Sequence, residues 1–197
     1  MANLKLKNPS GGSLNLVSVD GASDLIVTFP AGTGTAVVNG VSSAIVNGTA
    51  VASTSGTSID FTGIPNWVKR ITVMFRGVST NGTSDYLIQI GSGSPTTSGY
   101  TGSSSVVTTG VGTRNFTTGF GVYNNIGAGT VIDGSVTISA FGSNIWIASG
   151  VTAITSAIGT MPTGGSVTLG GTLDRVRLTT VNGTDTFDAG SINIMYE

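Results

Sequence analysis

Apolar residues in this chain recur at every second position in short runs, and glycine, serine, threonine or asparagine separates one run from the next. This period matches β-strands that bury one face. A glycine interrupts every window in which apolar residues could form a helical stripe, and only Ala153 to Ala157 could make a helical turn. The pattern therefore predicts an all-β fold of about ten strands.

The first 54 residues carry this pattern only sparsely. Two short strands separated by a turn are expected around the alternating leucines, and a third is expected from Leu25 to Phe29. These strands are too short to bury a core, so residues 1–54 are predicted to be an N-terminal attachment arm and linker. The leucines that would make the attachment are Leu4, Leu6, Leu14 and Leu16.

Residues 55–197 hold both tryptophans and six of the seven phenylalanines, so the hydrophobic core is expected there. Strands spaced about 8–12 residues apart, with turn signals between them, are typical of a sandwich or a barrel. At this size the usual solution is a jelly roll. The sequence therefore predicts a jelly-roll-like β-sandwich after an extended β arm.

Charge is scarce, because only 9% of residues are charged and the net charge is −1. Such a surface offers no basic field for nucleic acid. No run of apolar residues approaches the roughly 20 that a membrane helix needs, so membrane insertion is not expected. The residues after Met1 do not form a secretory signal, which predicts a protein made and folded in a cytoplasm.

The sequence contains neither histidine nor cysteine. The commonest general base, the commonest metal ligand and the strongest nucleophile are therefore missing together. Two aspartates could still serve a glycosidase, but most of them occupy turn contexts in which they cap their own backbone. We expect a non-enzymatic protein without a cofactor or a metal, and leave open calcium binding near Asp185 and Asp188, whose spacing matches no EF-hand loop.

Several side chains are candidates for contact with a partner. Trp67 and Trp146 could stack on a sugar, although core packing is the better interpretation of both. Residues 91–105 form a polar segment longer than an ordinary loop, which predicts an exposed or subunit-held excursion around Tyr100. Tyr100 and Tyr123 are accordingly the exposed contact candidates. The basic pairs at residues 69–70 and at residues 175 and 177 are expected at sheet edges or between subunits.

Two segments resemble known proteins. Residues 4–16 (LKLKNPSGGSLNL) and 25–35 (LIVTFPAGTGT) resemble the opening of many tailed-bacteriophage virion proteins, in which a strand pair and a strand ending in Phe-Pro-Ala precede a fibre or knob. Residues 55–75 (SGTSIDFTGIPNWVKRITVMF) look like the start of the C-terminal domain of phage tail-fibre and related appendage proteins.

This resemblance implies a homotrimer on the virion surface, with the arm toward the particle and the C-terminal domain outward. Its other partners would be the major capsid protein or tail proteins. Two placements are open. A head decoration or cement protein would clamp capsid subunits, whereas a tail fibre or receptor-binding protein would recognise a host surface glycan.

Overall fold

The computed structural model of the 197-residue chain describes residues 3–7, 13–17, 45–122 and 127–197. The chain divides into two units, residues 1–38 and 39–197. This boundary lies before the predicted one at residue 54, because residues 46–52 form strands that belong to the second unit.

The first unit contains β1 (Asn3–Lys7) and β2 (Ser13–Val17), which pair antiparallel. Leu4 lies opposite Leu16 and Leu6 lies opposite Leu14, which is the register that the alternating leucines predict. The third strand expected in this unit, residues 25–29, lies outside the described residues.

The second unit is built from antiparallel strands alone, and no helix occurs in the ranges that the structure describes. The described residues accordingly contain no helix that is long and apolar enough to cross a membrane. The prediction of an all-β fold is confirmed for these residues. The glycines and β-branched residues that interrupt every helical stripe account for this outcome.

Nine strands form the large sheet, in the order β10-β9-β14-β13-β12-β6-β16-β3, with β4 also paired to β16. Eight of them lie in one path, and β3 and β4 share the outer edge of β16. Their bounds are β3 (Val46–Asn47), β4 (Val51–Ala52), β6 (Arg70–Thr80), β9 (Thr101–Val107), β10 (Val111–Phe116), β12 (Ile132–Gly142), β13 (Ile145–Ile154), β14 (Thr160–Thr168) and β16 (Phe187–Tyr196).

Five strands form the small sheet, in the order β11-β7-β15-β5, with β8 paired to β7. The chain passes from one sheet to the other eight times: before and after β5, between β6 and β7, between β8 and β9, before and after β11, and before and after β15. The bounds are β5 (Ile59–Thr62), β7 (Tyr86–Ser92), β8 (Ser94–Pro95), β11 (Phe120–Val122) and β15 (Arg175–Thr180).

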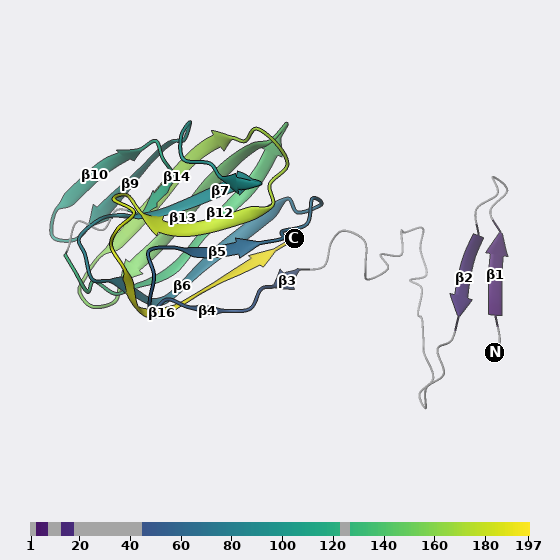
Figure 1. Ribbon diagram of the computed structural model, residues 1–197, viewed down its shortest axis with the longest axis horizontal. Helices are drawn as coiled ribbons and strands as arrows, with labels where there is room; N and C mark the ends of the chain where they lie inside the picture. Colours follow the sequence, from purple (N-terminus) through teal and green to yellow (C-terminus); the bar gives the residue numbers. More distant parts are fainter. Residues whose placement is uncertain (1–2, 8–12, 18–44, 123–126) are drawn as a thin grey trace, which may run out of the picture. The chain divides into compact units, whose positions relative to one another are not determined.

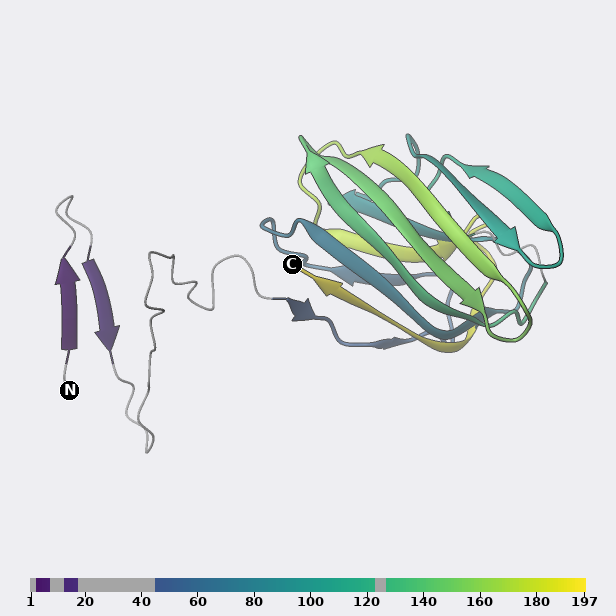
Figure 2. The same ribbon diagram turned by 180° about the vertical axis from the view of Figure 1, so that it is seen from behind.

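The two sheets lie as two layers (Figures 1 and 2), and one hydrophobic cluster draws residues from both. On β6, for example, Ile71, Val73 and Phe75 are buried while the residues between them are not. On β15, Val176 and Leu178 point into the same cluster. The apolar residues that recur at every second position are therefore the ones that face inward, between the two layers of a sandwich.

One local expectation is wrong, and one local possibility is not realised. The segment 91–105, expected to be an excursion, supplies the short β8 and then β9, which pairs with β14 and β10 inside the large sheet. Residues 153–157, the one place where the sequence allowed a helical turn, do not form one, because Ala153 and Ile154 continue β13 in register with β12. In both places pairing with distant strands decides the conformation rather than local propensity.

Candidate functional site

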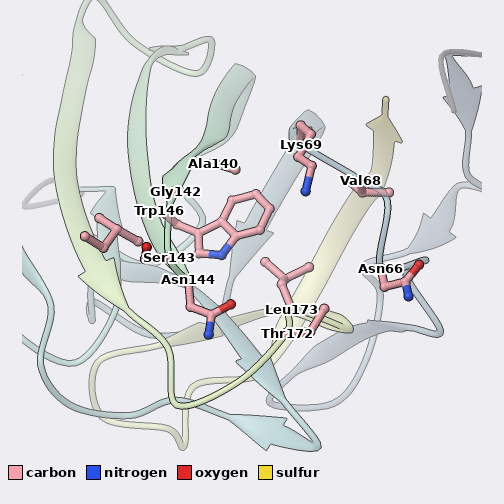
Figure 3. Close-up of a pocket in the computed structure, with 11 residues that line it drawn as sticks. Asn66, Val68, Lys69, Ala140, Gly142, Ser143, Asn144, Trp146, Thr172 and Leu173 are labelled. Atoms are coloured by element: carbon pink, nitrogen blue, oxygen red, sulfur yellow. The ribbon is translucent and has the colours of Figure 1, made fainter.

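A pocket of about 210 Å³ lies where three segments distant in sequence meet (Figure 3). These segments are the turn before β6, the hairpin that joins β12 to β13, and the connection before β15. Its lining residues are Asn66, Val68, Lys69, Ala140, Gly142, Ser143, Asn144, Ile145, Trp146, Thr172 and Leu173. Two further hollows, next to Tyr100 and next to Arg177, are more open to solvent.

The β12–β13 hairpin fixes one wall of the pocket. Its two turn residues, Ser143 and Asn144, have positive φ angles of 48° and 62°, as the tight turns that suit twisted strands require. The carbonyl oxygen of Asn144 accepts a hydrogen bond from the amide of Leu169 at 3.0 Å. Trp146 follows two residues later, in register between Ala140 and Val167. Figure 3 shows its indole ring at the middle of the pocket.

Backbone hydrogen bonds also fix the opposite wall. The amide of Val68 donates to the carbonyl of Pro65 at 3.1 Å, which closes the turn before β6. The amide of Lys69 donates to the carbonyl of Glu197 at 2.7 Å, and its carbonyl accepts from the amide of Ala140 at 2.8 Å. The Lys69 backbone is therefore held between β16 and β12, while its exposed side chain points toward the pocket in Figure 3.

The lining combines an apolar interior with hydrogen-bond donors. Val68, Trp146 and Leu173 are buried, whereas Asn66 and Lys69 are exposed. None of the eleven lining residues is a carboxylate, a histidine or a cysteine. A pair of groups that could act as general acid and general base is thus missing from this lining. The arrangement suits the binding of a small ligand that is rich in hydrogen-bond acceptors.

Tyr100 is not the exposed contact that the sequence predicts. Its side chain is only 2% exposed, and its ring packs edge-on against Phe120 with ring centroids 5.0 Å apart. The hydroxyl accepts a hydrogen bond from the Ile90 amide at 2.9 Å and lies 3.2 Å from the Ile90 carbonyl, to which it donates. Burial raises the pKa of Tyr100 to about 12. Tyr100 therefore stabilises the fold, and replacing residues 99–101 would destabilise it.

The remaining predicted contact residues are placed only in part. The pairing of β1 and β2 sets Leu4, Leu6, Leu14 and Leu16 on facing strands, whereas Tyr123 lies outside the described residues. Trp146 is 6% exposed and lies in the core, as the sequence indicates. Trp67 is half-buried and packs against Tyr196, with ring centroids 5.9 Å apart.

Each carboxylate side chain in the described part of the chain has a partner. Four of them form ion pairs, Asp60 with Arg177, Asp85 with Arg114, Asp174 with Arg175 and Glu197 with Arg70. The other three accept hydrogen bonds, Asp133 from the Gly77 amide, Asp185 from the Ser84 amide and Asp188 from the Ser79 hydroxyl. The Arg175 guanidinium holds the pKa of Asp174 below its usual value.

The two aspartates near which calcium binding was left open, Asp185 and Asp188, both accept hydrogen bonds within the protein. One oxygen of Asp185 accepts from the Ser84 amide at 2.9 Å and the other from the side-chain amide of Asn182 at 2.6 Å. Among the described residues, no group of three acidic, histidine or cysteine side chains lies close enough together to hold a metal ion. The geometry therefore assigns Asp185 to a turn, whereas Asp188 lies on β16 and accepts a hydrogen bond from the Ser79 hydroxyl on β6.

Sequence reasoning missed the pocket itself. Asn66 and Asn144 carried no signal beyond their turn positions, and Lys69 was expected at a sheet edge. Its place before the long β6 was visible in the sequence, but its neighbours across the pocket were not.

Comparison with known proteins gives no relative for this chain. No family model, no curated protein and no solved structure matches it.

Proposed function

We propose that this chain is a non-enzymatic structural protein of a tailed-phage virion, a trimeric knob on the particle surface that decorates or cements the capsid. Its second unit would be a jelly-roll-like sandwich facing outward. The β1–β2 pair, with Leu4, Leu6, Leu14 and Leu16, would attach it to the major capsid protein or to tail proteins. The virion surface would be its location after synthesis in the host cytoplasm.

The observation that best supports a structural role is that the described carboxylates all have partners within the protein. Every one that is described is engaged in an ion pair or a hydrogen bond that ties together strands or turns. A glycosidase would need two of them free and about 5–10 Å apart across a substrate site. Here they stabilise the sandwich instead.

Two further features support the virion placement. The paired strands β1 and β2 belong to a unit separate from the sandwich, which fits an arm that acts through what it binds. A strand pair can attach by adding its free edge to a neighbouring sheet, which requires main-chain hydrogen bonds rather than special side chains. The sequence resemblance at residues 4–35 and 55–75 points to the same class of protein.

Deletion of the arm tests this proposal. Removing residues 1–38 leaves β3 and β4 in place on β16, so the truncated protein should remain folded and trimeric but no longer join particles. Removing residues 1–54 is the matched comparison, since it also strips β3 and β4 and should lower the melting temperature. Size-exclusion mass, melting and particle incorporation are measured together, and labelled protein in electron micrographs distinguishes head from tail. Particles decorated by the shorter chain would contradict the role of the arm.

The pocket in Figure 3 favours a second candidate, a tail-fibre or receptor-binding protein that recognises a host surface glycan. An apolar interior that includes a tryptophan, surrounded by amides, hydroxyls and one ammonium group, is a surface that sugars can bind. Loss of adsorption to host cells after a pocket substitution, with particle incorporation unchanged, would support this role over the first.

A further inference from the structure

The indole N–H of Trp146 lacks an acceptor. The residue is only 6% exposed, and no hydrogen bond joins its nitrogen to any part of the chain that the structure describes. In Figure 3 the nitrogen lies on the side of the ring toward Asn144, at the wall of the pocket. The nitrogen is not among the fully buried polar atoms without a partner, which are the hydroxyls of Thr80 and Thr152, so it is accessible from the pocket. An acceptor that enters the pocket would supply the missing hydrogen bond.

The ammonium group of Lys69 is also available. Arg70, Arg114, Arg175 and Arg177 each form an ion pair, whereas Lys69 forms none with a carboxylate in the described ranges. No carboxylate lines the pocket toward which it points. A compact ammonium in this position attracts a negatively charged ligand, and its effect is greater beside low-dielectric walls.

The size and lining of the pocket further limit the kind of ligand that fits. A volume of about 210 Å³ is below the roughly 300–1,000 Å³ of pockets for drug-sized ligands, so it holds a unit no larger than one sugar ring. Val68 and Leu173 offer an apolar wall, which a bare inorganic anion could not use. A pyranose presents both C–H groups for this wall and oxygens for the amides of Asn66 and Asn144.

We infer that this pocket binds a sugar residue that carries a carboxylate, as a uronic acid unit of an acidic surface polysaccharide does. The ligand class rests on the second proposed function, recognition of a host glycan. In this arrangement Lys69 pairs with the carboxylate, the Trp146 indole donates to a ring or hydroxyl oxygen, and the two asparagines bind the remaining hydroxyls.

The test uses the full-length protein and two probes, methyl β-D-glucuronide and its neutral counterpart methyl β-D-glucoside. Binding is followed through the indole N–H resonance of Trp146 in the NMR spectrum, which Trp146→Phe identifies by its loss. The glucuronide should shift this resonance in a saturable way, and the glucoside should bind at least tenfold more weakly. Added salt should weaken glucuronide binding, because the Lys69 charge is close to solvent.

Substitutions distinguish the local charge of Lys69 at the pocket from the effect of the overall charge of the protein. Lys69→Met should reduce glucuronide affinity at least tenfold, to that of the glucoside. Arg76→Met is the matched control, since it removes one positive charge from an exposed position on β6 outside the pocket, and should change affinity less than twofold. Asn144→Gly removes an amide at a position where the positive φ suits glycine, so a lowered affinity would not reflect turn strain.

Four results would overturn the inference. Equal binding of both glycosides would show that the pocket does not select for the carboxylate. Equal effects of Lys69→Met and Arg76→Met would show that the Lys69 ammonium has no specific role in binding. Tighter binding of a short peptide through its terminal carboxylate would assign the pocket to a protein partner. Particle incorporation tests the capsid-decoration role, and adsorption to host cells tests the glycan-recognition role. If host adsorption is normal but the protein does not bind the glucuronide, the acidic sugar is the wrong ligand, while the glycan-recognition role is not refuted.

Discussion

The hydroxyl of Tyr100 should contribute measurably to stability, although its sequence neighbours are glycine, serine and threonine. Tyr100→Phe keeps the ring that packs on Phe120 and removes the oxygen that accepts the Ile90 amide. The Ile90 carbonyl still accepts from the amide of Thr96 at 3.0 Å, so the Ile90 N–H is the group that loses its partner. An unpaired buried amide costs about 1–3 kcal/mol.

In a unit of this size, 1 kcal/mol corresponds to about 2–4 °C in melting temperature, so a loss of about 1–3 kcal/mol should make Tyr100→Phe melt about 2–12 °C below the parent protein. Tyr100→Ala should cost about 3–5 kcal/mol, because the core contact with Phe120 is lost as well. Tyr196→Phe is the matched control, since the Tyr196 hydroxyl has no hydrogen bond to any described residue. Differential scanning calorimetry measures all three, and equal melting of the two phenylalanine variants would refute this account.

Burial raises the pKa of both Tyr86 and Tyr100 to about 12, above the ordinary 10.0. Their contribution to stability should therefore be complete below pH 10 and lost as the pH rises toward 12, which alkaline melting curves would show. Between about pH 6 and 8 melting should stay nearly constant, because no side chain here titrates at its ordinary pKa in that range, and a steep change would contradict this. A methyl group added by Gly121→Ala would collide with the Phe116 ring and should destabilise by about 1–3 kcal/mol, whereas Gly170→Ala, which meets open space, should leave denaturant midpoints unchanged.

The sequence was sufficient to predict the strands that alternate strongly. The runs around Ile71 to Phe75 and Val176 to Leu178 became β6 and β15, because a two-residue apolar period is compatible only with a strand that buries one face. The antiparallel β1–β2 pair was visible for the same reason. For these elements, the local sequence pattern alone was enough for the prediction.

Strands made of serine, threonine and glycine were missed. β9 and β10 offer few large apolar side chains, and β9 is defined by pairing with β14, nearly 60 residues later. Tyr100 was misjudged for a related reason, since its partners Ile90 and Phe120 come from separate strands. Pairing and burial between distant segments leave little trace in a local window.

The pocket was hidden in the same way. Its walls come from residues 66–69, 140–146 and 172–173, and each of these segments has a separate local interpretation as a turn or a strand end. What marks the pocket as a site is two unpartnered donors, one on Trp146 and one on Lys69, and an unpartnered donor is recognised only when its neighbours in space are known.

The position of β16 has a consequence for how the protein is made. This strand is the last of the large sheet to be synthesised, yet it pairs with β6 at eight positions and carries both β3 and β4 on its other side. Until residues 187–197 leave the ribosome, one edge of β6 has no neighbour and the earliest strands of the sandwich have nothing to pair with. The nascent chain must therefore expose an unpaired strand edge for most of its synthesis. Its low charge offers little protection against association between neighbouring nascent chains, so slower elongation should lower the yield of folded protein.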